Sequence, residues 1–164
     1  MVIESIEEIR AAFIARRCDA YTTDASSLAS FRFSQGPNAD RYLLLPDIIP
    51  KEPLGAVVRK GDQKFFDIVR WTHFAQITAE ELGINSTNIG TFANSTNPEV
   101  QRFIGRTGDL GRMLGLENDF AVRVVTQVGN FAEVWDRNIT PLGVQRGINA
   151  LWTNGGLQYA PPMR

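Results

Sequence analysis

Apolar residues at helical spacing, together with capping residues, predict two helices near the start of this chain. Ser5 and Glu8 have the spacing of a capping box, and the apolar residues that follow recur every three or four positions. Farther along, Asp24 or Ser26 is suited to cap a second helix, which the Gly-Pro-Asn sequence at 36–38 is expected to end.

Short runs of residues between and after these helices indicate β-strands. One run covers residues 18–23, a second covers 42–45, and a third covers 54–59. Val2 and Ile3 fit the end of a further strand. The N-terminal third of the chain therefore alternates strands and helices, which is the pattern of an α/β fold.

After the third run the pattern predicts helices only. Asp62 is suited to cap a long helix that Gly83 ends. Apolar residues occur around nearly all of this helix, so we expect it to be buried on most sides. About four short strands are too few to cover so much helical surface, which indicates that part of the fold lies N-terminal to the chain. Shorter helices are predicted at 98–104, 110–114, 121–135 and 142–151, before an irregular tail at 153–164.

Charge and composition argue against several classes of function. The 17 basic and 18 acidic residues give a net charge of −1, which offers no electrostatic reason to expect nucleic acid or an anionic membrane as a partner. The single cysteine, Cys18, cannot form an internal disulfide, and a single histidine, His73, argues against a histidine-based metal site. The N-terminus has acidic residues before basic ones, the reverse of a signal peptide, and no apolar stretch reaches the about 20 residues that span a membrane.

Asp24 is the first candidate for a functional residue. It lies where a predicted strand passes into a helix, and ligands of open α/β sheets bind at this edge. A carboxylate there is suited to pair with a cationic group, but Asp is also a common N-cap. The pattern of residues leaves both interpretations open.

A hydrolase is the second interpretation, with His73 as base and a nearby serine or Cys18 as nucleophile. No serine lies in a Gly-x-Ser-x-Gly sequence, and we expect His73 to be packed within the long apolar helix. The glycines from Gly105 to Gly111 match neither a phosphate-binding loop nor a dinucleotide-binding fingerprint, and they predict a loop between helices.

Three segments carry a resemblance to a known family. The run Arg-Cys-Asp-Ala-Tyr-Thr-Thr-Asp at 17–24 resembles a conserved turn in the second lobe of type II periplasmic binding proteins. The segment at 45–62 resembles the strand by which their chain returns to the first lobe, and the tail at 149–164 is similar to the usual ending of the binding proteins for general or polar L-amino acids. The resemblance covers essentially the whole chain.

This resemblance implies an α/β chain with part of the type II periplasmic-binding-protein fold. Residues 1–53 would belong to the second lobe, 54–61 would form the return or hinge strand, and 62–164 would supply the helical part of the first lobe and a C-terminal extension. It also implies a truncated amino-acid-binding component of an ABC importer, located in the periplasm. Its partners would be an L-amino acid and the membrane subunits of the transporter, without cofactor, metal or catalytic residues.

The resemblance assigns the binding of the ligand α-ammonium to Asp24, and we expect Thr23 and Tyr21 beside it at the site. The arginine that binds the ligand carboxylate in the family would lie upstream of residue 1, together with most of the first lobe. We therefore expect weak binding by the isolated chain and a homo-oligomer that covers its exposed apolar surface. A purely structural, self-assembling fragment is the remaining alternative.

Overall fold

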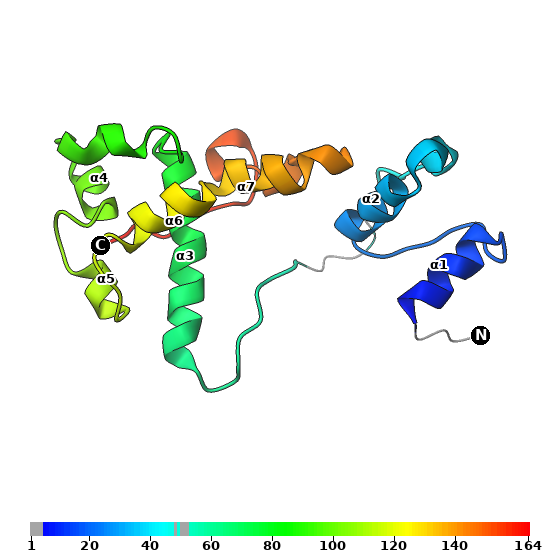
Figure 1. Cartoon of the computed structure of the whole chain (residues 1–164), viewed down its shortest axis with the longest axis horizontal. Helices are drawn as coiled ribbons and strands as arrows, with labels where there is room; N and C mark the ends of the chain where they lie inside the picture. Colours follow the sequence, from blue (N-terminus) through cyan, green and yellow to red (C-terminus); the bar gives the residue numbers. More distant parts are fainter. Residues whose placement is uncertain (1–4, 48, 50–52) are drawn as a thin grey trace. The chain divides into compact units, whose positions relative to one another are not determined.

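The computed structural model describes residues 5–47, 49 and 53–164, which belong to two compact units, Met1–Glu52 and Pro53–Arg164 (Figure 1). None of the helices in this described part is both long and apolar enough to cross a membrane.

Within its described residues, the first unit contains two α-helices and a 3₁₀-helix. α1 (Ile6–Ile14) begins after Ser5, whose side chain accepts a hydrogen bond from the Glu8 amide. α2 (Ala25–Ser34) is followed by η1 (Gly36–Arg41), so both predicted helices are confirmed. Four aromatic side chains, with neighbouring ring centroids 5.4–6.0 Å apart, pack together in this unit: Phe13, Tyr21, Phe31 and Tyr42.

The second unit is built around α3 (Gln63–Glu81), against which α6 (Phe120–Val128) and α7 (Phe131–Asn138) pack (Figure 1). The other elements are short: η2 (Ile89–Asn94), α4 (Pro98–Phe103), α5 (Leu110–Met113), η3 (Thr140–Leu142), η4 (Gly147–Asn149) and η5 (Trp152–Asn154). The main core contains Ala75, Ala79, Ile84, Ile89, Val100, Phe103, Phe120, Ala121, Val125 and Met163.

Both predicted ends of α3 are confirmed. The Asp62 carboxylate accepts a hydrogen bond of 3.0 Å from the Phe65 amide and caps the first turn. At the other end, Gly83 has a φ of 68°, and the Ile84 amide returns to the Ala79 carbonyl at 2.8 Å. This is the arrangement of a Schellman motif, in which a left-handed glycine satisfies the last carbonyls of a helix.

The prediction that α3 is buried on most sides is wrong for its N-terminal half. The fully buried residues of this helix are Ala75, Ile77, Thr78 and Ala79, all in its C-terminal half. By contrast, Phe65 is 51% exposed and Phe66 is 41% exposed.

Two of the later helix predictions are also wrong. The helix expected at 121–135 is divided into α6 and α7, because Gly129 has a φ of 96° and Asn130 caps a new helix in a capping box with Glu133. The helix expected at 142–151 does not form, because Gly143 and Gly147 have positive φ values of 76° and 48°. The predicted helices at 98–104 and 110–114 are present as α4 and α5.

The strands predicted at 18–23, 42–45 and 54–59 do not form. Within the described residues the structure has no strand, and β-pairing is limited to an isolated bridge between Leu151 and Gln158. A strand needs a neighbour that takes up its backbone hydrogen bonds, and these segments have none in the described part of the chain. The α/β part of the predicted fold class is therefore not confirmed; Val2 and Ile3 lie outside the described residues.

Candidate functional site

Asp24 lies directly before the first residue of α2 and is half-buried. Its backbone carbonyl accepts a hydrogen bond of 2.9 Å from the Leu28 amide, so the backbone has the position of an N-cap. Its carboxylate makes no capping hydrogen bond. The side chain therefore does not act as the cap that the residue type suggested, and the carboxylate lies near the positive end of the helix dipole without a helix donor.

The surroundings of Asp24 differ from those predicted. Because residues 18–23 form no strand, the expected position of Asp24 at the end of a strand is wrong. Tyr21 belongs to the aromatic cluster, with its ring 5.9 Å from Phe13 and 6.0 Å from Phe31. Thr23 is half-buried next to Asp24. All three predicted site residues thus lie in the short segment that leads into α2, with the Tyr21 ring used for packing.

Among the residues that the structure describes, none gives His73 the hydrogen bonds of a catalytic base. It lies on an exposed side of α3, and its ring packs edge to face against Phe131 at 5.7 Å between centroids. Partial withdrawal of the His73 ring from water lowers its pKa below the ordinary value. No hydrogen bond joins His73 to a serine or cysteine within the described residues, and Cys18 is exposed in the first unit. The prediction that His73 is packed is therefore confirmed only for the side of its ring that contacts Phe131.

Glu133 is the centre of a polar cluster that the sequence analysis missed. Its carboxylate accepts hydrogen bonds from the Ser86 hydroxyl, from the Ser86 amide at 3.0 Å and from the Asn130 amide at 2.8 Å. Burial raises the pKa of Glu133, but the hydrogen bonds from Ser86 and Asn130 lower it by more, so the net shift is downward. The side-chain amide of Asn130 donates a further hydrogen bond, of 2.8 Å, to the Ile84 carbonyl. The cluster therefore links the loop after α3 to the start of α7. In the sequence, the Asn-x-x-Glu spacing of a capping box was the signal from which this cluster could have been predicted.

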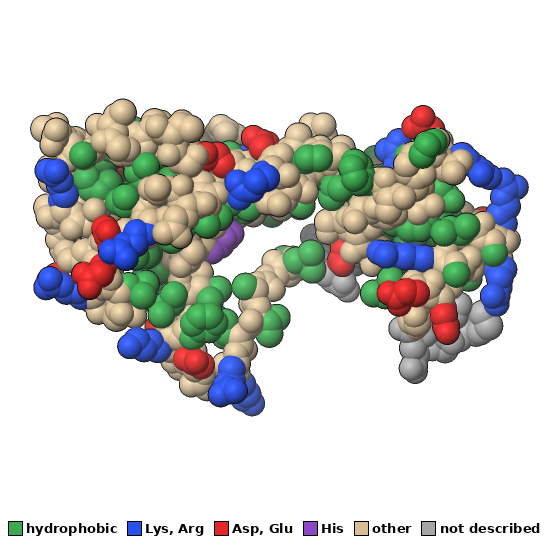
Figure 2. All heavy atoms as spheres, viewed as in Figure 1, with side chains coloured by type: hydrophobic (Ala, Val, Ile, Leu, Met, Phe, Trp, Pro, Cys, Tyr) green, Lys and Arg blue, Asp and Glu red, His purple; other side chains and the backbone are tan. Residues whose placement is uncertain are grey.

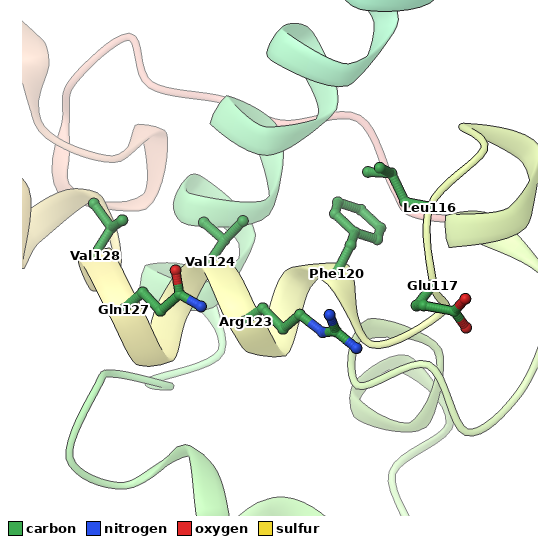
Figure 3. Close-up of a pocket in the computed structure, with 7 residues that line it drawn as sticks. All are labelled: Leu116, Glu117, Phe120, Arg123, Val124, Gln127 and Val128. Atoms are coloured by element: carbon green, nitrogen blue, oxygen red, sulfur yellow. The ribbon is translucent and has the colours of Figure 1, made fainter.

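A shallow groove of about 300 Å³ follows α6 (Figure 3). Figure 3 shows Phe120, Val124 and Val128 along one side of the helix, with Leu116 and Glu117 on the preceding loop. The Arg123 side chain beside them already donates a hydrogen bond of 2.9 Å to Asp119. The groove therefore offers an apolar surface bordered by Glu117 and by Arg123, whose charge is already paired with Asp119. Among the residues described, no three metal-ligating side chains lie together.

Comparison with known proteins finds relatives over the whole chain. It is 50% identical to the general L-amino acid-binding periplasmic protein AapJ of Rhizobium johnstonii, with 100% of this chain and 49% of that protein matched. It is 53% identical to the glutamate/glutamine/aspartate/asparagine-binding protein BztA of Rhodobacter capsulatus, with 93% of this chain and 46% of that protein matched. The chain thus spans about half the length of the curated relatives it matches, and no protein-family model matches it.

A solved structure has the same backbone arrangement. It is an ABC transporter periplasmic binding protein from Brucella ovis with glutathione bound, and it is 47% identical to this chain. The TM-score is 0.93, and the match covers 100% of this chain and 52% of the other. The rest of that larger chain has no counterpart in the 164 residues considered.

Proposed function

Since this chain is homologous over its whole length to part of the periplasmic amino-acid-binding proteins of ABC transporters, we propose that it supplies one side of a receptor site for an L-amino acid. The proposal includes a periplasmic location and delivery of the ligand to the membrane subunits of a transporter. It is supported by the relatives, which are described as amino-acid-binding proteins.

The ligand contact that we propose is between the Asp24 carboxylate and the α-ammonium of the amino acid. The observation that supports it is that Asp24 is a half-buried residue whose carboxylate makes no capping hydrogen bond with α2. A buried or half-buried carboxylate is stabilised by a cationic hydrogen-bond donor, and an ammonium group supplies three donors. Thr23 and the hydroxyl group of Tyr21 are proposed as neighbouring polar contacts.

The same chemistry extends the proposed ligands beyond free amino acids. Glutathione, which the Brucella ovis protein binds, carries a free α-ammonium and α-carboxylate on its γ-glutamyl residue. A site that recognises this head group accepts either an amino acid or a γ-glutamyl peptide. Asp24 would contact the ammonium in both cases.

Affinity is expected to be low for this chain alone. An exposed ion pair contributes roughly 0–1 kcal/mol, whereas a dissociation constant of 1 mM requires about 4 kcal/mol. The ligand carboxylate needs a cationic partner of its own, which we propose lies in the part of the relatives that this chain does not span. Weak binding is therefore part of the proposal.

An NMR titration tests the proposed contact, because chemical shifts report binding even at millimolar dissociation constants. The amides around Asp24 should shift on addition of L-amino acids or glutathione, and Asp24→Asn should abolish these shifts. Asp19→Asn is the matched control, since Asp19 is an exposed aspartate in the same segment between α1 and α2. Equal titrations for Asp24→Asn and the unsubstituted chain would exclude Asp24 from the site.

A further inference from the structure

We propose that Trp152 and Tyr159, together with the Glu81 carboxylate, form a binding site for a small quaternary ammonium ion. The site lies in the second unit, where the C-terminal loop meets the last residue of α3. It takes a different class of ligand from the amino-acid site proposed above and shares no residue with it. The inference therefore goes beyond that function.

The first observation is an exposed pair of aromatic rings. The planes of the Trp152 and Tyr159 rings meet at 76°, with the ring centroids 5.9 Å apart. Trp152 is 52% exposed and Tyr159 is 57% exposed. Rings in a core use their faces for packing, whereas these two leave surface open to solvent. Two open rings nearly at right angles are suited to contact one cation from two sides, as in the aromatic cages that bind methylated ammonium groups.

The second observation is a carboxylate beside the rings. The indole N–H of Trp152 donates a hydrogen bond to the Glu81 carboxylate. Glu81 is exposed, and none of the ion pairs among the described residues involves it. A carboxylate has more acceptor sites than one indole N–H uses, so it keeps its charge and further acceptor capacity for a ligand.

The backbone of the loop holds both rings in place. The Trp152 amide donates a hydrogen bond of 2.9 Å to the Gln158 carbonyl. Leu151, next to Trp152, is 4% exposed, and Ala160, next to Tyr159, is 6% exposed; both pack in a core cluster with α3. A ligand would therefore meet rings that are already positioned, which lowers the entropic cost of binding.

Local charges favour a cation at this site. Arg146 donates a hydrogen bond to the Asn149 carbonyl in the same loop, but its charge is paired with Glu80. Figure 2 shows acidic and basic side chains interspersed on one face of the second unit, so no broad positive field arises from that face. The charge of Glu81 therefore decides the sign of the ligand.

A quaternary ammonium ion suits these groups better than a primary one. A primary ammonium has three N–H donors to satisfy, whereas the proposed site consists mainly of ring faces. A quaternary ammonium has no donor. Its methyl groups would pack against the rings of Trp152 and Tyr159, and Glu81 would balance its charge.

The test is an NMR titration of the full chain with choline chloride, compared with sodium chloride at equal concentration. The indole N–H resonance of Trp152 should shift saturably, and those of Trp71 and Trp135 serve as internal controls. The uncharged alcohol in which carbon replaces the choline nitrogen has the same shape. Choline should bind about tenfold more tightly than this alcohol, because the rings and the carboxylate act on its charge.

Variants separate the ring from the hydroxyl group and from the charge. Tyr159→Phe keeps the ring and should retain the affinity for choline. Tyr159→Leu and Glu81→Gln should each weaken binding by about threefold or more. Phe33→Leu is the matched control, because it removes a ring that is 62% exposed in the first unit, and it should leave the titration unchanged.

The proposal is overturned if choline and the uncharged alcohol bind equally, or if the Trp71 and Trp135 resonances shift as much as that of Trp152. It is also overturned if Tyr159→Leu and Glu81→Gln both leave the affinity unchanged. Sedimentation of the chain with phosphatidylcholine vesicles, without saturable binding of choline, would identify a lipid surface as the ligand and would overturn it too. The readout is the Trp152 indole in the second unit, so the proposed amino-acid site around Asp24 is tested separately.

Discussion

The guanidinium group of Arg146 donates two hydrogen bonds to the carboxylate of Glu80, at 2.6 and 3.2 Å, across 66 positions of the sequence. The Arg146 side chain is 22% exposed and the Glu80 side chain 11% exposed. The guanidinium also lies over the Phe131 ring, 5.3 Å from its centroid. This pair therefore fastens the C-terminal loop to α3, and its removal would leave a carboxylate that is largely withdrawn from water.

Arg146→Ala should lower the free energy of unfolding by about 2 kcal/mol, because hydrogen bonds to charged groups contribute roughly 1.5–3 kcal/mol. Arg146→Lys should recover only part of this, since lysine cannot form the planar two-bond contact. Chemical denaturation measures both. Arg112→Ala, in an exposed pair with Asp109, is the control and should change stability by under about 1 kcal/mol. If Arg146→Ala and Arg112→Ala lowered the free energy of unfolding equally, the stabilising role given to the Arg146–Glu80 pair would be contradicted.

Acid should destabilise the second unit partly through Glu133. The folded-state pKa of this carboxyl is lowered, so its contribution is fully present above the unfolded-state pKa and is lost as pH falls through the folded-state value. The free energy of unfolding should therefore decrease with falling pH below about 4.3, the usual glutamate pKa. Glu133→Gln should flatten this dependence, whereas Glu99→Gln, at an exposed position in α4, should preserve it.

His73 gives a second, independent pH response. Its pKa is lowered by burial, so stability should fall as pH decreases through about 6.5, where unfolded histidine takes up a proton first. As the chain has a single histidine, one NMR titration reports its midpoint. Phe131→Ala should raise that midpoint toward the ordinary value by exposing the ring. A midpoint that does not move would show that Phe131 does not desolvate His73.

Gly111→Ala should destabilise the chain, although alanine is the better helix former. A Cβ atom at position 111 would lie 2.1 Å from the Glu117 backbone oxygen, and this contact cannot be relieved by rotating a side chain. We expect a loss of at least about 2 kcal/mol in thermal or chemical denaturation. Gly90→Ala, where a Cβ meets nothing within 4 Å, is the control and should be nearly neutral.

The isolated chain should self-associate at micromolar concentration, as the exposed apolar segments are not covered within the second unit. Light scattering should give an average mass above 18.3 kDa. Val57→Lys should reduce it, because a charge on an extended edge disfavours pairing. Leu157→Lys is the control: Leu157 is 74% exposed, but its amide already donates to the Ile148 carbonyl at 2.7 Å. A monomer of 18.3 kDa at all concentrations would contradict this prediction.

Local chemistry was enough to predict most helices and their ends. Ser5 and Asp62 cap α1 and α3 as their sequence positions suggested, and Gly83 ends α3. Such signals act within one or two turns, so neighbouring residues carry them completely. The same reasoning failed at Gly129, because the apolar periodicity continues past this residue although the helix ends there. It also placed Asp24 at the end of a strand that the described residues do not form.

By itself, the sequence determined most of the helices of this protein, its resemblance to amino-acid-binding proteins and the choice of Asp24 as the candidate ligand contact. Tertiary structure decided which apolar residues are buried, because burial depends on partners distant in the chain. It separated the buried Ala75 from the exposed Phe65 on one helix, and it brought Glu80 to Arg146. It also left residues 54–58 without regular secondary structure and without backbone hydrogen bonds to other described residues, since strand propensity becomes a sheet only where a neighbouring strand supplies the missing hydrogen bonds.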